Sequence, residues 1–510
     1  MRNIDRIYID GAFVTPHGRE RAELINPATE AVIGHVTLGD REDTLRAIAA
    51  AKRAWPAYAR STKAERIALL RRLHEAVLAR AGDINAATTE EYGGPVSRAS
   101  WVASYAAGSF LLAAKTLEQY PFTRQIGSAQ VVMEPVGVAG LITPWNSNAG
   151  FICNKLATAL AAGCTVVIKP SEMSAIQTQV VTEALHAAGL PPGLFNIVNG
   201  RGDVVGAELS SHPDVAKISF TGSTAVGKAI QRAGADTLKR VTLELGGKSP
   251  TVVLDDADFA TAIPLAVTAG FQNSGQACLA GTRILVPEHR LDEAIAFARA
   301  AVEAVKVGDP RDAATEVGPM VSRKQWERVQ GYIRKGVAEG ARLITGGEGR
   351  PAGLDAGFYV RPTLFAGVRN DMVIAREEIF GPVLCLIAYR DEEDAIAIAN
   401  DTVYGLQAVV LSGSDEHALA VSSRLHAGRV LINGLHHEPL APFGGFKQSG
   451  IGREFGSFGL EAYLEPKSVI KAADSHRPLS NSNKEPADLI QNLVRTSRRA
   501  SSIVPRVYQP

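Results

Sequence analysis

The stretch QNSGQACLAG, residues 272–281, places Cys278 among glycine, serine, alanine and amide side chains. The chain has 510 residues and only four cysteines. A cysteine kept for packing is usually surrounded by larger apolar residues, whereas small neighbours let another molecule reach the sulfur. A free thiol has a pKa of about 8.5, so at neutral pH it needs a base or surroundings that favour the thiolate. We interpret Cys278 as a candidate nucleophile, with a packing cysteine as the alternative.

Two other stretches could supply the groups that such a thiol needs. LELGGKSP, residues 243–250, places Glu244 at the end of an apolar strand. There desolvation raises the proton affinity of a carboxylate, which can then act as a base near neutral pH. TPWN, residues 143–146, supplies Asn146, whose side-chain amide is a neutral donor suited to an oxyanion. Taken alone, Glu244 could be an ion-paired residue and Asn146 a turn residue.

A third stretch, KISFTGSTAVGKAI at 217–230, has the features of a phosphate site. A strand ends near Phe220, Gly222 permits a tight turn, and Ser223 or Thr224 can cap the helix that follows. The N-terminus of a helix presents free N–H groups and a partial positive charge, which suit a phosphate. The stretch is not GxGxxG, so an ordinary capped turn is the alternative.

The stretch VVIKPSE at 166–172 also lies at the end of a predicted strand. Lys169 can reach ribose hydroxyls or a phosphate, and Glu172 can accept hydrogen bonds from a vicinal diol. An acidic residue at that place favours NAD over NADP, because it would repel a 2′-phosphate. A solvated lysine and glutamate beside a turn are the alternative.

The elements that must position these residues follow from the hydrophobic periodicity. Apolar residues recur at three- and four-residue steps over 42–120, which predicts helices. From 136 to 246 short apolar runs alternate with helical segments, and a second alternating region runs from about 251 to 433. Such alternation predicts parallel sheets built from βαβ units, in which ligands bind at the carboxyl ends of the strands. Most of the polar motifs fall at such ends.

Three segments lie outside this pattern. Residues 122–137 alternate apolar and polar side chains like a hairpin, and 463–472 resemble a lone strand. Two such strands could pair with each other or add to the sheet edge of a neighbouring chain. Residues 475–510 are polar, rich in proline and serine, and locally basic, so we expect a disordered or surface-hugging extension.

The composition limits the class of protein. Hydrophobic residues make up 46% and charged residues 21% of the chain, and the formal net charge is +1, so nucleic acid is not an expected partner. The N-terminus lacks the apolar core of a signal peptide, and the apolar run at 156–168 is too short to cross a bilayer. The four cysteines are scattered without zinc spacing. We therefore expect a cytoplasmic protein without a metal, a disulfide framework or a membrane partner.

The order of seven motifs is similar to that of the NAD(P)-dependent aldehyde dehydrogenase superfamily. These motifs are TPWN, KPSE, FTGST, ELGGKSP, GQAC, EEIFGPV and PFGGFKQSGIGRE. The resemblance covers about residues 5–472 and implies an α/β fold with a Rossmann-like NAD-binding domain, an α/β catalytic domain and a small β oligomerisation element. The implied parts are 1–121 and 138–246 for NAD binding, 247–436 for catalysis, 437–460 as a return segment to the NAD-binding domain, 122–137 and 461–474 as oligomerisation strands, and 475–510 as an extension.

The resemblance also implies roles for the candidate residues. Cys278 attacks an aldehyde to give a thiohemiacetal, and Asn146 and the backbone N–H of Cys278 hold the oxyanion. Hydride transfer to NAD leaves a thioester, which water activated by Glu244 hydrolyses to a carboxylic acid. Lys155 and Glu454 resemble a family pair proposed to relay the proton from the base.

The cofactor implied is NAD, with NADP disfavoured by Glu172, and the partners implied are a small aldehyde and further copies in a homodimer or homotetramer. The implied cofactor-binding residues are Thr143, Trp145, Lys169, Ser171, Glu172, Gly202, Gly206, Phe220, Thr221, Gly222, Ser223, Leu245, Gly246, Glu378 and Phe380.

The sequence departs from the pattern at two sites that are often aromatic in relatives acting on small aldehydes. These are Ser147 and Asn154, whose small polar side chains predict a wider or wetter substrate funnel. His436 and His437 would lie near its mouth, where they could meet a carboxylate or be plain loop residues.

Three alternatives stay open beside hydrolytic oxidation of an aldehyde. The first is a semialdehyde dehydrogenase for polar or carboxylate-bearing aldehydes. The second is an acylating relative using coenzyme A, which Glu244 disfavours because it activates water. The third is a catalytically silent binding protein, which the presence of Cys278, Glu244 and Asn146 disfavours.

Overall fold

The computed structural model describes residues 1–471, so the extension predicted at 475–510 lies outside the described residues. The chain divides into two compact units. The first contains Met1–Phe122 and Met133–Pro466. The second contains Thr123–Val132 and, among the described residues, 467–471.

The first 40 residues form strands that the periodicity did not predict. Their bounds are β1 (Arg2–Ile4), β2 (Ile7–Ile9), β3 (Ala12–Val14), β4 (Arg21–Ile25) and β5 (Val32–Thr37). Strands β1, β5 and β4 form a small sheet, whereas β2 and β3 extend the edge of a larger one. Most of these strands are only three to five residues long, too short to show a clear period of two.

The helices predicted over 42–120 are confirmed. They are α1 (Arg41–Tyr58), α2 (Lys63–Leu78), α3 (Ala81–Ala87), the π-helical turn η1 (Thr88–Tyr92) and α4 (Val96–Gln119). Asp40 and Thr62 start α1 and α2 with capping boxes, in which the side chain accepts the backbone N–H three residues on. Helix α4 begins after Pro95 and has no side-chain cap.

An eight-stranded sheet follows from the βαβ units predicted over 136–246. Its order is β20-β12-β11-β8-β9-β10-β2-β3. The chain passes outward from β8 to β10, then returns to the other side of β8 for β11 and β12, so a topological switch point lies between β8 and β11. The bounds are β8 (Val138–Ile142), α5 (Asn148–Ala162), β9 (Thr165–Lys169), η2 (Glu172–Ser174), α6 (Ala175–Ala187), β10 (Phe195–Ile197), η3 (Gly202–Gly206), α7 (Ala207–Ser211), β11 (Val215–Thr221), α8 (Thr224–Ala235) and β12 (Arg240–Glu244).

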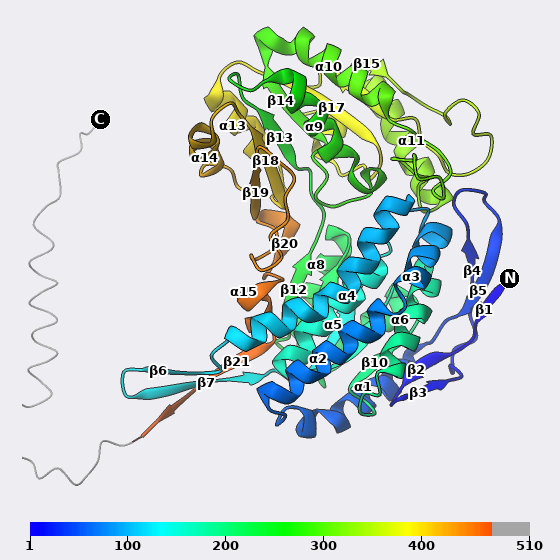
Figure 1. The fold of residues 1–510 in the computed structure, drawn as a ribbon, viewed down its shortest axis with the longest axis vertical. Coiled ribbons are helices and arrows are strands. Elements are labelled where there is room, and N and C mark those ends of the chain that lie inside the picture. The colour runs from blue at the N-terminus through cyan, green and yellow to red at the C-terminus, as the bar shows by residue number, and fades with distance from the viewer. Residues whose placement is uncertain (472–510) are drawn as a thin grey trace, which may run out of the picture. The chain divides into compact units, whose positions relative to one another are not determined.

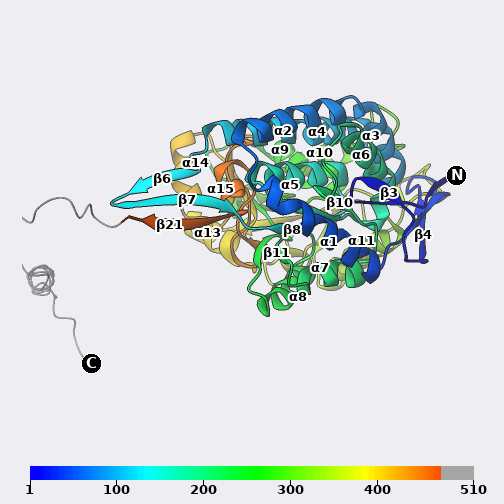
Figure 2. The ribbon, with the colours of Figure 1, turned by 90° about the horizontal axis from the view of Figure 1, so that it is seen from below.

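Helices cover both faces of this sheet, which is why its strands are continuously apolar. Figure 2 shows α2 and α4 along one side and α7 and α8 along the other. Side chains of β9 alternate between the two cores: Val166 and Ile168 pack in the core that contains α2, α4 and α5, and Val167 packs in the core that contains α1 and α7. The two-residue period therefore fixes which side chains enter each core.

The second alternating region forms a seven-stranded sheet of order β15-β16-β17-β14-β13-β18-β19, drawn in green to orange in Figure 1. It is parallel except at β15. Its elements are β13 (Pro250–Val253), α9 (Phe259–Phe271), η4 (Gln272–Gly275), β14 (Arg283–Pro287), η5 (Glu288–Arg290), α10 (Leu291–Ala304), α11 (Arg323–Ala338), β15 (Arg342–Thr345), β16 (Thr363–Ala366), α12 (Val373–Arg376), β17 (Val383–Tyr389), α13 (Glu392–Asn400), β18 (Gln407–Leu411), α14 (Asp415–Ser422) and β19 (Arg429–Ile432).

After β19 the chain returns to the first sheet. Strand β20 pairs antiparallel with β12 through Leu243–Ile451 and Glu244–Gly450. The two stray segments of the sequence join a three-stranded sheet of order β21-β7-β6. The bounds are η6 (Lys447–Ser449), β20 (Gly450–Ile451), α15 (Gly456–Glu461), β21 (Leu464–Ile470), β6 (Thr123–Ile126) and β7 (Ala129–Pro135).

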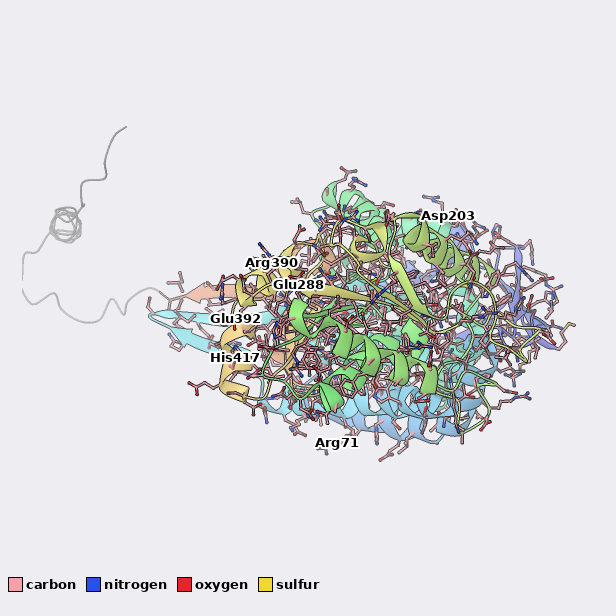
Figure 3. All side chains as sticks on the ribbon, turned by 90° about the horizontal axis from the view of Figure 1, so that it is seen from above. Arg71, Asp203, Glu288, Arg390, Glu392 and His417 are labelled. Carbon is pink, nitrogen blue, oxygen red and sulfur yellow. The ribbon has the colours of Figure 1, made fainter. Side chains whose placement is uncertain are left out.

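Charged side chains project from the surface, among them the labelled Arg71, Asp203 and Arg390 in Figure 3. Arg71 lies 2.8 Å from Glu118, in an exposed ion pair. Exposed pairs of this kind contribute little to stability, so the fold depends mainly on its apolar cores. Within residues 1–471, no helix combines the length and the apolar character that a membrane span requires.

Candidate active site

Five parallel strands end at the same edge of the eight-stranded sheet, and most predicted site residues follow those ends. In such sheets ligands bind outside the carboxyl ends, at the switch point. The residues are Thr143, Trp145 and Asn146 after β8, Lys169, Ser171 and Glu172 at β9, Gly202 and Gly206 after β10, Phe220, Thr221, Gly222 and Ser223 at β11, and Glu244, Leu245 and Gly246 at β12.

The loop that carries Cys278 has an unusual backbone. Asn273, Ser274 and Gly275 are all left-handed, with φ of 54°, 59° and 72°. The side chain of Gln276 holds this loop in place, since its Oε1 accepts the N–H of Val321 over 3.0 Å. The amide and hydroxyl residues around Cys278 therefore fix the shape of the loop. This structural role explains why the neighbours of Cys278 are polar rather than apolar.

Cys278 differs from the other cysteines in exposure. Cys153, Cys164 and Cys385 are fully buried in apolar cores, whereas Cys278 is partly exposed. Burial, followed by the nearby carboxylates of Glu378 and Glu244, raises the pKa of the Cys278 thiol to about 12, and Arg429 opposes the rise. The sulfur is therefore a thiol at neutral pH and needs a base to become a nucleophile.

Asn146 connects the end of β8 to this loop. Its Nδ2 donates a hydrogen bond of 2.9 Å to the carbonyl of Gln276, two residues before Cys278. The Nδ2 of Asn273 donates to the Asn146 carbonyl over 3.0 Å. The two contacts bring the side-chain amide next to the cysteine loop, although the residues are more than a hundred positions apart.

Glu244 is buried with neither carboxylate oxygen hydrogen-bonded. Burial, followed by the charge of Glu454, raises the pKa of Glu244 well above its usual value, and Lys155 opposes the rise. Gly444 makes room for the carboxylate, because a Cβ there would lie 2.7 Å from its Oε1. Both oxygens are thus free to accept a proton or to orient water.

The glycines after Glu244 bring the backbone close to other site residues. A Cβ at Gly247 would lie 2.3 Å from the Cys278 carbonyl oxygen, and one at Gly246 would lie 2.7 Å from Glu378 Oε2. The N–H of Gly247 also donates to Glu378 Oε1 over 3.2 Å. Any larger side chain at these positions would displace the cysteine loop or the carboxylate of Glu378. Burial raises the pKa of Glu378 to about 7.

Lys155 and Glu454 form a buried ion pair, as the resemblance implies. The Nζ of Lys155 also donates to the Ser219 hydroxyl over 3.0 Å, and that hydroxyl donates to Glu454 Oε1 over 3.3 Å. The three residues line one small cavity together with Thr242, two positions before Glu244 on β12. The pair also shifts the pKa of Glu244, so it is electrically coupled to the candidate base.

The ends of β11 and β12 fit the phosphates of a dinucleotide. The hydroxyl of Thr221 is buried and has no hydrogen-bond partner. Ser223 is the N-cap of the twelve-residue helix α8, and its side chain accepts the N–H of Val226 over 3.4 Å. Gly222 packs so closely against Phe220 that a Cβ would lie 2.4 Å from the ring. The N-terminus of α8, with the small residues Thr221, Gly222 and Ser223 before it, therefore suits a pyrophosphate.

The end of β9 presents the groups predicted for an adenosine ribose. Lys169 Nζ lies 3.1 Å from Glu172 Oε2. Ser171 is the N-cap of η2 and accepts the N–H of Met173 over 3.3 Å. The carboxylate of Glu172 is half-exposed, so it can accept hydrogen bonds from a diol.

Two aromatic residues predicted for the cofactor meet each other. The rings of Trp145 and Phe380 are edge to face with centroids 5.4 Å apart. Phe380 has φ of 64°, a strained conformation for a phenylalanine, in the segment after Glu378.

The other predicted cofactor residues lie in backbone turns and contacts after the strands. The N–H of Thr143 donates to the carbonyl of Lys169 over 3.1 Å. Gly202 and Gly206 bound the π-helical turn η3 that follows β10.

Ser147 and Asn154, the two positions expected to make the substrate funnel wider or wetter, both have polar partners in the structure. Arg98 donates a hydrogen bond to the Ser147 hydroxyl, so a guanidinium lies against the small side chain. The Nδ2 of Asn154 donates to Glu454 Oε2 over 3.3 Å, and the residue is buried. Both small polar side chains are therefore engaged by polar partners.

The surroundings of the two histidines expected near the mouth favour plain loop residues over an anion site. The Nδ1 of His437 contacts Arg429 over 3.0 Å, and burial followed by the charge of Arg429 lowers the pKa of His437. A neutral imidazole cannot pair with a carboxylate. His436 is exposed beside Gly434. The structure favours the reading of both as loop residues.

Sequence reasoning missed two arginines near Cys278. Arg98 lies in the first turn of α4 and Arg429 begins β19, and both interact electrostatically with the thiol. Neither lies in a motif. One signal was available: a cation in the first turn of a helix opposes the helix dipole and thus calls for a reason.

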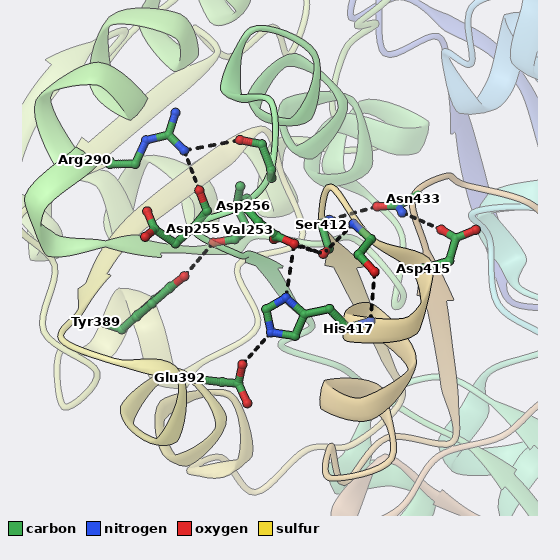
Figure 4. Close-up of polar contacts among 12 residues, drawn as sticks. Val253, Asp255, Asp256, Arg290, Tyr389, Glu392, Ser412, Asp415, His417 and Asn433 are labelled. Atoms are coloured by element: carbon green, nitrogen blue, oxygen red, sulfur yellow. Dashed lines mark hydrogen bonds and ion pairs between the residues drawn. The ribbon is translucent and has the colours of Figure 1, made fainter.

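A second polar cluster lies at the carboxyl ends of β13, β18 and β19 (Figure 4). His417 contacts Asp256 over 3.1 Å through Nδ1 and Glu392 over 2.6 Å through Nε2. Ser412 donates to both oxygens of Asp256. Within residues 1–471 no group of histidine, cysteine and carboxylate side chains is arranged to hold a metal, so this cluster links α13 and α14 to the sheet.

Comparison with known proteins agrees with this geometry. A family model described as the aldehyde dehydrogenase family matches residues 13–469. A 3-succinoylsemialdehyde-pyridine dehydrogenase of a Pseudomonas species is 48% identical over 92% of this chain and 99% of its own.

Two solved structures have the same fold. A mutant of aldehyde dehydrogenase C from Pseudomonas syringae, in complex with NAD+ and octanal, is 46% identical with a TM-score of 0.91 over 92% of this chain and 98% of its own. A betaine aldehyde dehydrogenase of Staphylococcus aureus, in complex with NAD+, is 35% identical with a TM-score of 0.89 over 94% of this chain and 97% of its own. The chain has the aldehyde dehydrogenase fold and belongs to the aldehyde dehydrogenase family.

Proposed function

We propose that the chain oxidises an aldehyde to the carboxylic acid with NAD+, through a thioester on Cys278 that is hydrolysed by water activated by Glu244. The observation that supports this most is the convergence of three groups from distant segments. Asn146 donates to the loop of Cys278, and the charge of Glu244 acts on its thiol. Family membership and the NAD+ bound to two similar proteins support the reaction and the cofactor.

The first step needs a base and an oxyanion site. Because the Cys278 thiol holds its proton at neutral pH, the unpartnered carboxylate of Glu244 accepts that proton as the sulfur adds to the aldehyde carbon. The side-chain amide of Asn146 and the backbone N–H of Cys278 stabilise the oxyanion. Such a preorganised donor typically contributes about a hundred- to a thousand-fold in rate.

The second step releases the acid. NAD+, when bound, supplies the acceptor for the hydride that leaves the substrate carbon. The proton that Glu244 took from the thiol first passes to the buried pair of Lys155 and Glu454, through the small cavity beside Ser219. Glu244 then takes a proton from the water that attacks the thioester, and this proton goes to the departing sulfur, which regenerates the thiol. Glu244 favours water over coenzyme A as the acyl acceptor.

The residues at the carboxyl ends of the strands would hold the cofactor. Thr221, Gly222 and Ser223 with the N-terminus of α8 suit the pyrophosphate. Lys169 and Glu172 suit the adenosine ribose and favour NAD+ over NADP+. The remaining contacts are Thr143, Trp145, Ser171, Gly202, Gly206, Phe220, Leu245, Gly246, Glu378 and Phe380.

Replacing Cys278 tests the proposal. Cys278→Ala should abolish NADH formation with any aldehyde while NAD+ binding, followed by calorimetry, persists. Cys153→Ala is the matched control, because that cysteine is fully buried in an apolar core on α5. Turnover that survives in Cys278→Ala would overturn the mechanism.

We also propose that the protein assembles as a homodimer or homotetramer in the cytoplasm. Strands β6 and β21 are the edges of the three-stranded sheet, and all four side chains of β6 are exposed. An edge strand offers unpaired N–H and C=O groups to another chain. Light scattering of the full chain should give a mass of two or four subunits, and a monomer would contradict the proposal.

A further inference from the structure

Arg98 is a cation that lies beside the proposed oxyanion site. Its guanidinium donates to the hydroxyl of Ser147, the residue that follows Asn146 in the chain. It also interacts electrostatically with Cys278. Arg98 is thus within reach of a substrate held between the thiol and the amide.

The charge of Arg98 is not neutralised by the protein. No carboxylate lies within ion-pair distance of Arg98 among residues 1–471, and its Nε is buried without a hydrogen-bond partner. A guanidinium carries five N–H donors. The single hydrogen bond to Ser147 therefore leaves most of its donor capacity unused.

The fully buried Arg283 offers a comparison, because four acceptors engage its guanidinium, whereas Arg98 is partly exposed and has one. Arg283 donates to the backbone carbonyls of Lys248, Ile398 and Ala399 and to the side chain of Asn370. Burying an unpaired charge costs several kcal/mol, so such saturation is the usual arrangement. Arg98 differs from Arg283 because its guanidinium has unused N–H donors, and an anionic ligand would supply acceptors for them.

Two features hold the guanidinium of Arg98 in place. It lies over the ring of Trp101 at 4.1 Å, and Trp101 stacks on Tyr105 with centroids 4.9 Å apart. Burial lowers the pKa of Arg98 to about 10, so it stays charged at neutral pH. A guanidinium fixed in its plane matches the two oxygens of a carboxylate.

Arg429, the other arginine near the thiol, lacks this free capacity. Its Nε donates to Gln407 Oε1 over 2.7 Å and its guanidinium contacts His437. Three of the five N–H donors of Arg429 thus have neutral acceptors, so Arg429 has less to offer a substrate than Arg98.

We propose that Arg98 binds a carboxylate on the substrate, so that the chain acts on a short aldehyde acid, a semialdehyde. This inference rests on the proposed function, because it places the anchor beside Cys278. Ser147 and Asn146 are neighbours, and consecutive Cα atoms are about 3.8 Å apart. A carboxylate held by Arg98 would therefore lie close to the aldehyde carbon, which favours a short aldehyde acid.

A matched pair of aldehydes tests this inference. Succinic semialdehyde and butanal share a four-carbon chain and differ only in a terminal carboxylate or methyl group. With saturating NAD+, the wild-type chain should prefer the semialdehyde in kcat/KM. Arg98→Met should lower the ratio of the two kcat/KM values about a hundred-fold, mainly through KM, because a buried charge pair is lost. Arg98→Lys should lie between them, since it keeps the charge without the planar fork.

The controls separate a binding role from a structural one. Lys115→Met removes an exposed cation from the same helix and should leave the ratio unchanged. Alkylation of Cys278 by iodoacetamide reports whether the Arg98 variants keep the site intact. If Arg98→Met lowers both kcat/KM values equally, Arg98 acts on the thiol or the fold and the inference is wrong.

The failure of this inference and that of the proposed function look different. A wild-type chain that oxidises butanal, or a longer alkanal, in preference to the semialdehyde overturns the role of Arg98 and leaves the proposed function standing. A chain that forms no NADH with these two aldehydes or with any of a panel of longer and aromatic aldehydes overturns both.

Discussion

The backbone of Gly247 lies against that of Cys278: a Cβ on Gly247 would come within 2.3 Å of the Cys278 carbonyl oxygen. The base strand β12 and the loop of the nucleophile are thus in contact through main-chain atoms. The distance between the two parts of the site is therefore set by the absence of a side chain, and the site should be sensitive to a single methyl group.

Gly247→Ala should reduce kcat strongly and lower the unfolding temperature. The added methyl group must displace the cysteine loop, and overpacking of this kind typically costs about 1–3 kcal/mol. Gly82→Ala is the control, because it lies in helix α3 with nothing within 4 Å of the added carbon. Calorimetry at one scan rate measures the unfolding temperature of both variants, and steady-state NADH formation measures their kcat. An active, equally stable Gly247→Ala variant would show that the contact is dispensable.

Glu244→Gln should separate the two halves of the reaction. Because Glu244 also takes the thiol proton in the first step, the variant should form its one NADH per site slowly, and it should then stall as the thioester because no base activates water. The pKa of Glu244 is raised well above its usual value, so in the wild-type chain the carboxylate form and the rate should increase as the pH rises through that raised pKa. Stopped-flow absorbance measures the NADH formed in the first turnover, and pH–rate profiles of the wild-type chain measure the rise of the rate with pH. Steady turnover by Glu244→Gln would assign hydrolysis to another base.

Asn146→Ala should lower kcat/KM about a hundred- to a thousand-fold, since one oxyanion donor is lost. The variant also loses the hydrogen bond to Gln276, which could disturb the cysteine loop. The rate at which iodoacetamide alkylates Cys278 distinguishes the two effects. Unchanged alkylation with slow turnover supports the oxyanion role, whereas slow alkylation would point to the loop.

Glu172→Gln should weaken the preference for NAD+ over NADP+ by about tenfold. Removing the carboxylate removes repulsion of a 2′-phosphate and leaves Lys169, now unpaired, to attract it. The ratio of kcat/KM for the two cofactors is the measurement, and Glu183→Gln on α6 is a control away from the ribose site. A wild-type chain that uses both cofactors equally would contradict this role for Glu172.

His417 should make stability depend on pH. Its hydrogen bonds to Glu392 and Asp256 raise the pKa of His417 above 6.5. Because folding raises this pKa, protonated His417 contributes to the free energy of unfolding. The contribution is fully present below about pH 6.5, the pKa in the unfolded chain, and is lost as the pH rises through the pKa in the folded chain. Because the side chains are more than a third exposed, the contribution is at most about 1 kcal/mol.

His417→Gln should therefore lower the unfolding temperature more at pH 6 than at pH 9, relative to the wild-type chain. Thermal unfolding at a series of pH values checks this. His426→Gln, at an exposed histidine between α14 and β19, is the control. Equal losses at both pH values would show that the imidazolium contributes nothing.

The residue types and their periodicity were enough to predict the helices of 42–120, both alternating regions and the hairpin at β6 and β7. Local patterns suffice there because a helix or a buried strand repeats its apolar positions within a few residues. The short strands β1 to β3 were missed for the same reason, since three residues cannot show a period.

The sequence by itself determined which residues could do chemistry, because a thiol among small residues and polar groups at strand ends are local features. Only the tertiary structure decided which of them meet. Lys155 and Glu454 are 299 positions apart, and Asn146 reaches Gln276 across 130. Such contacts depend on the strand order and on where the chain returns to the sheet, which no local pattern encodes. Tertiary structure also determines that the charge of Arg98 has no carboxylate partner, since this depends on which residues the fold places around the guanidinium.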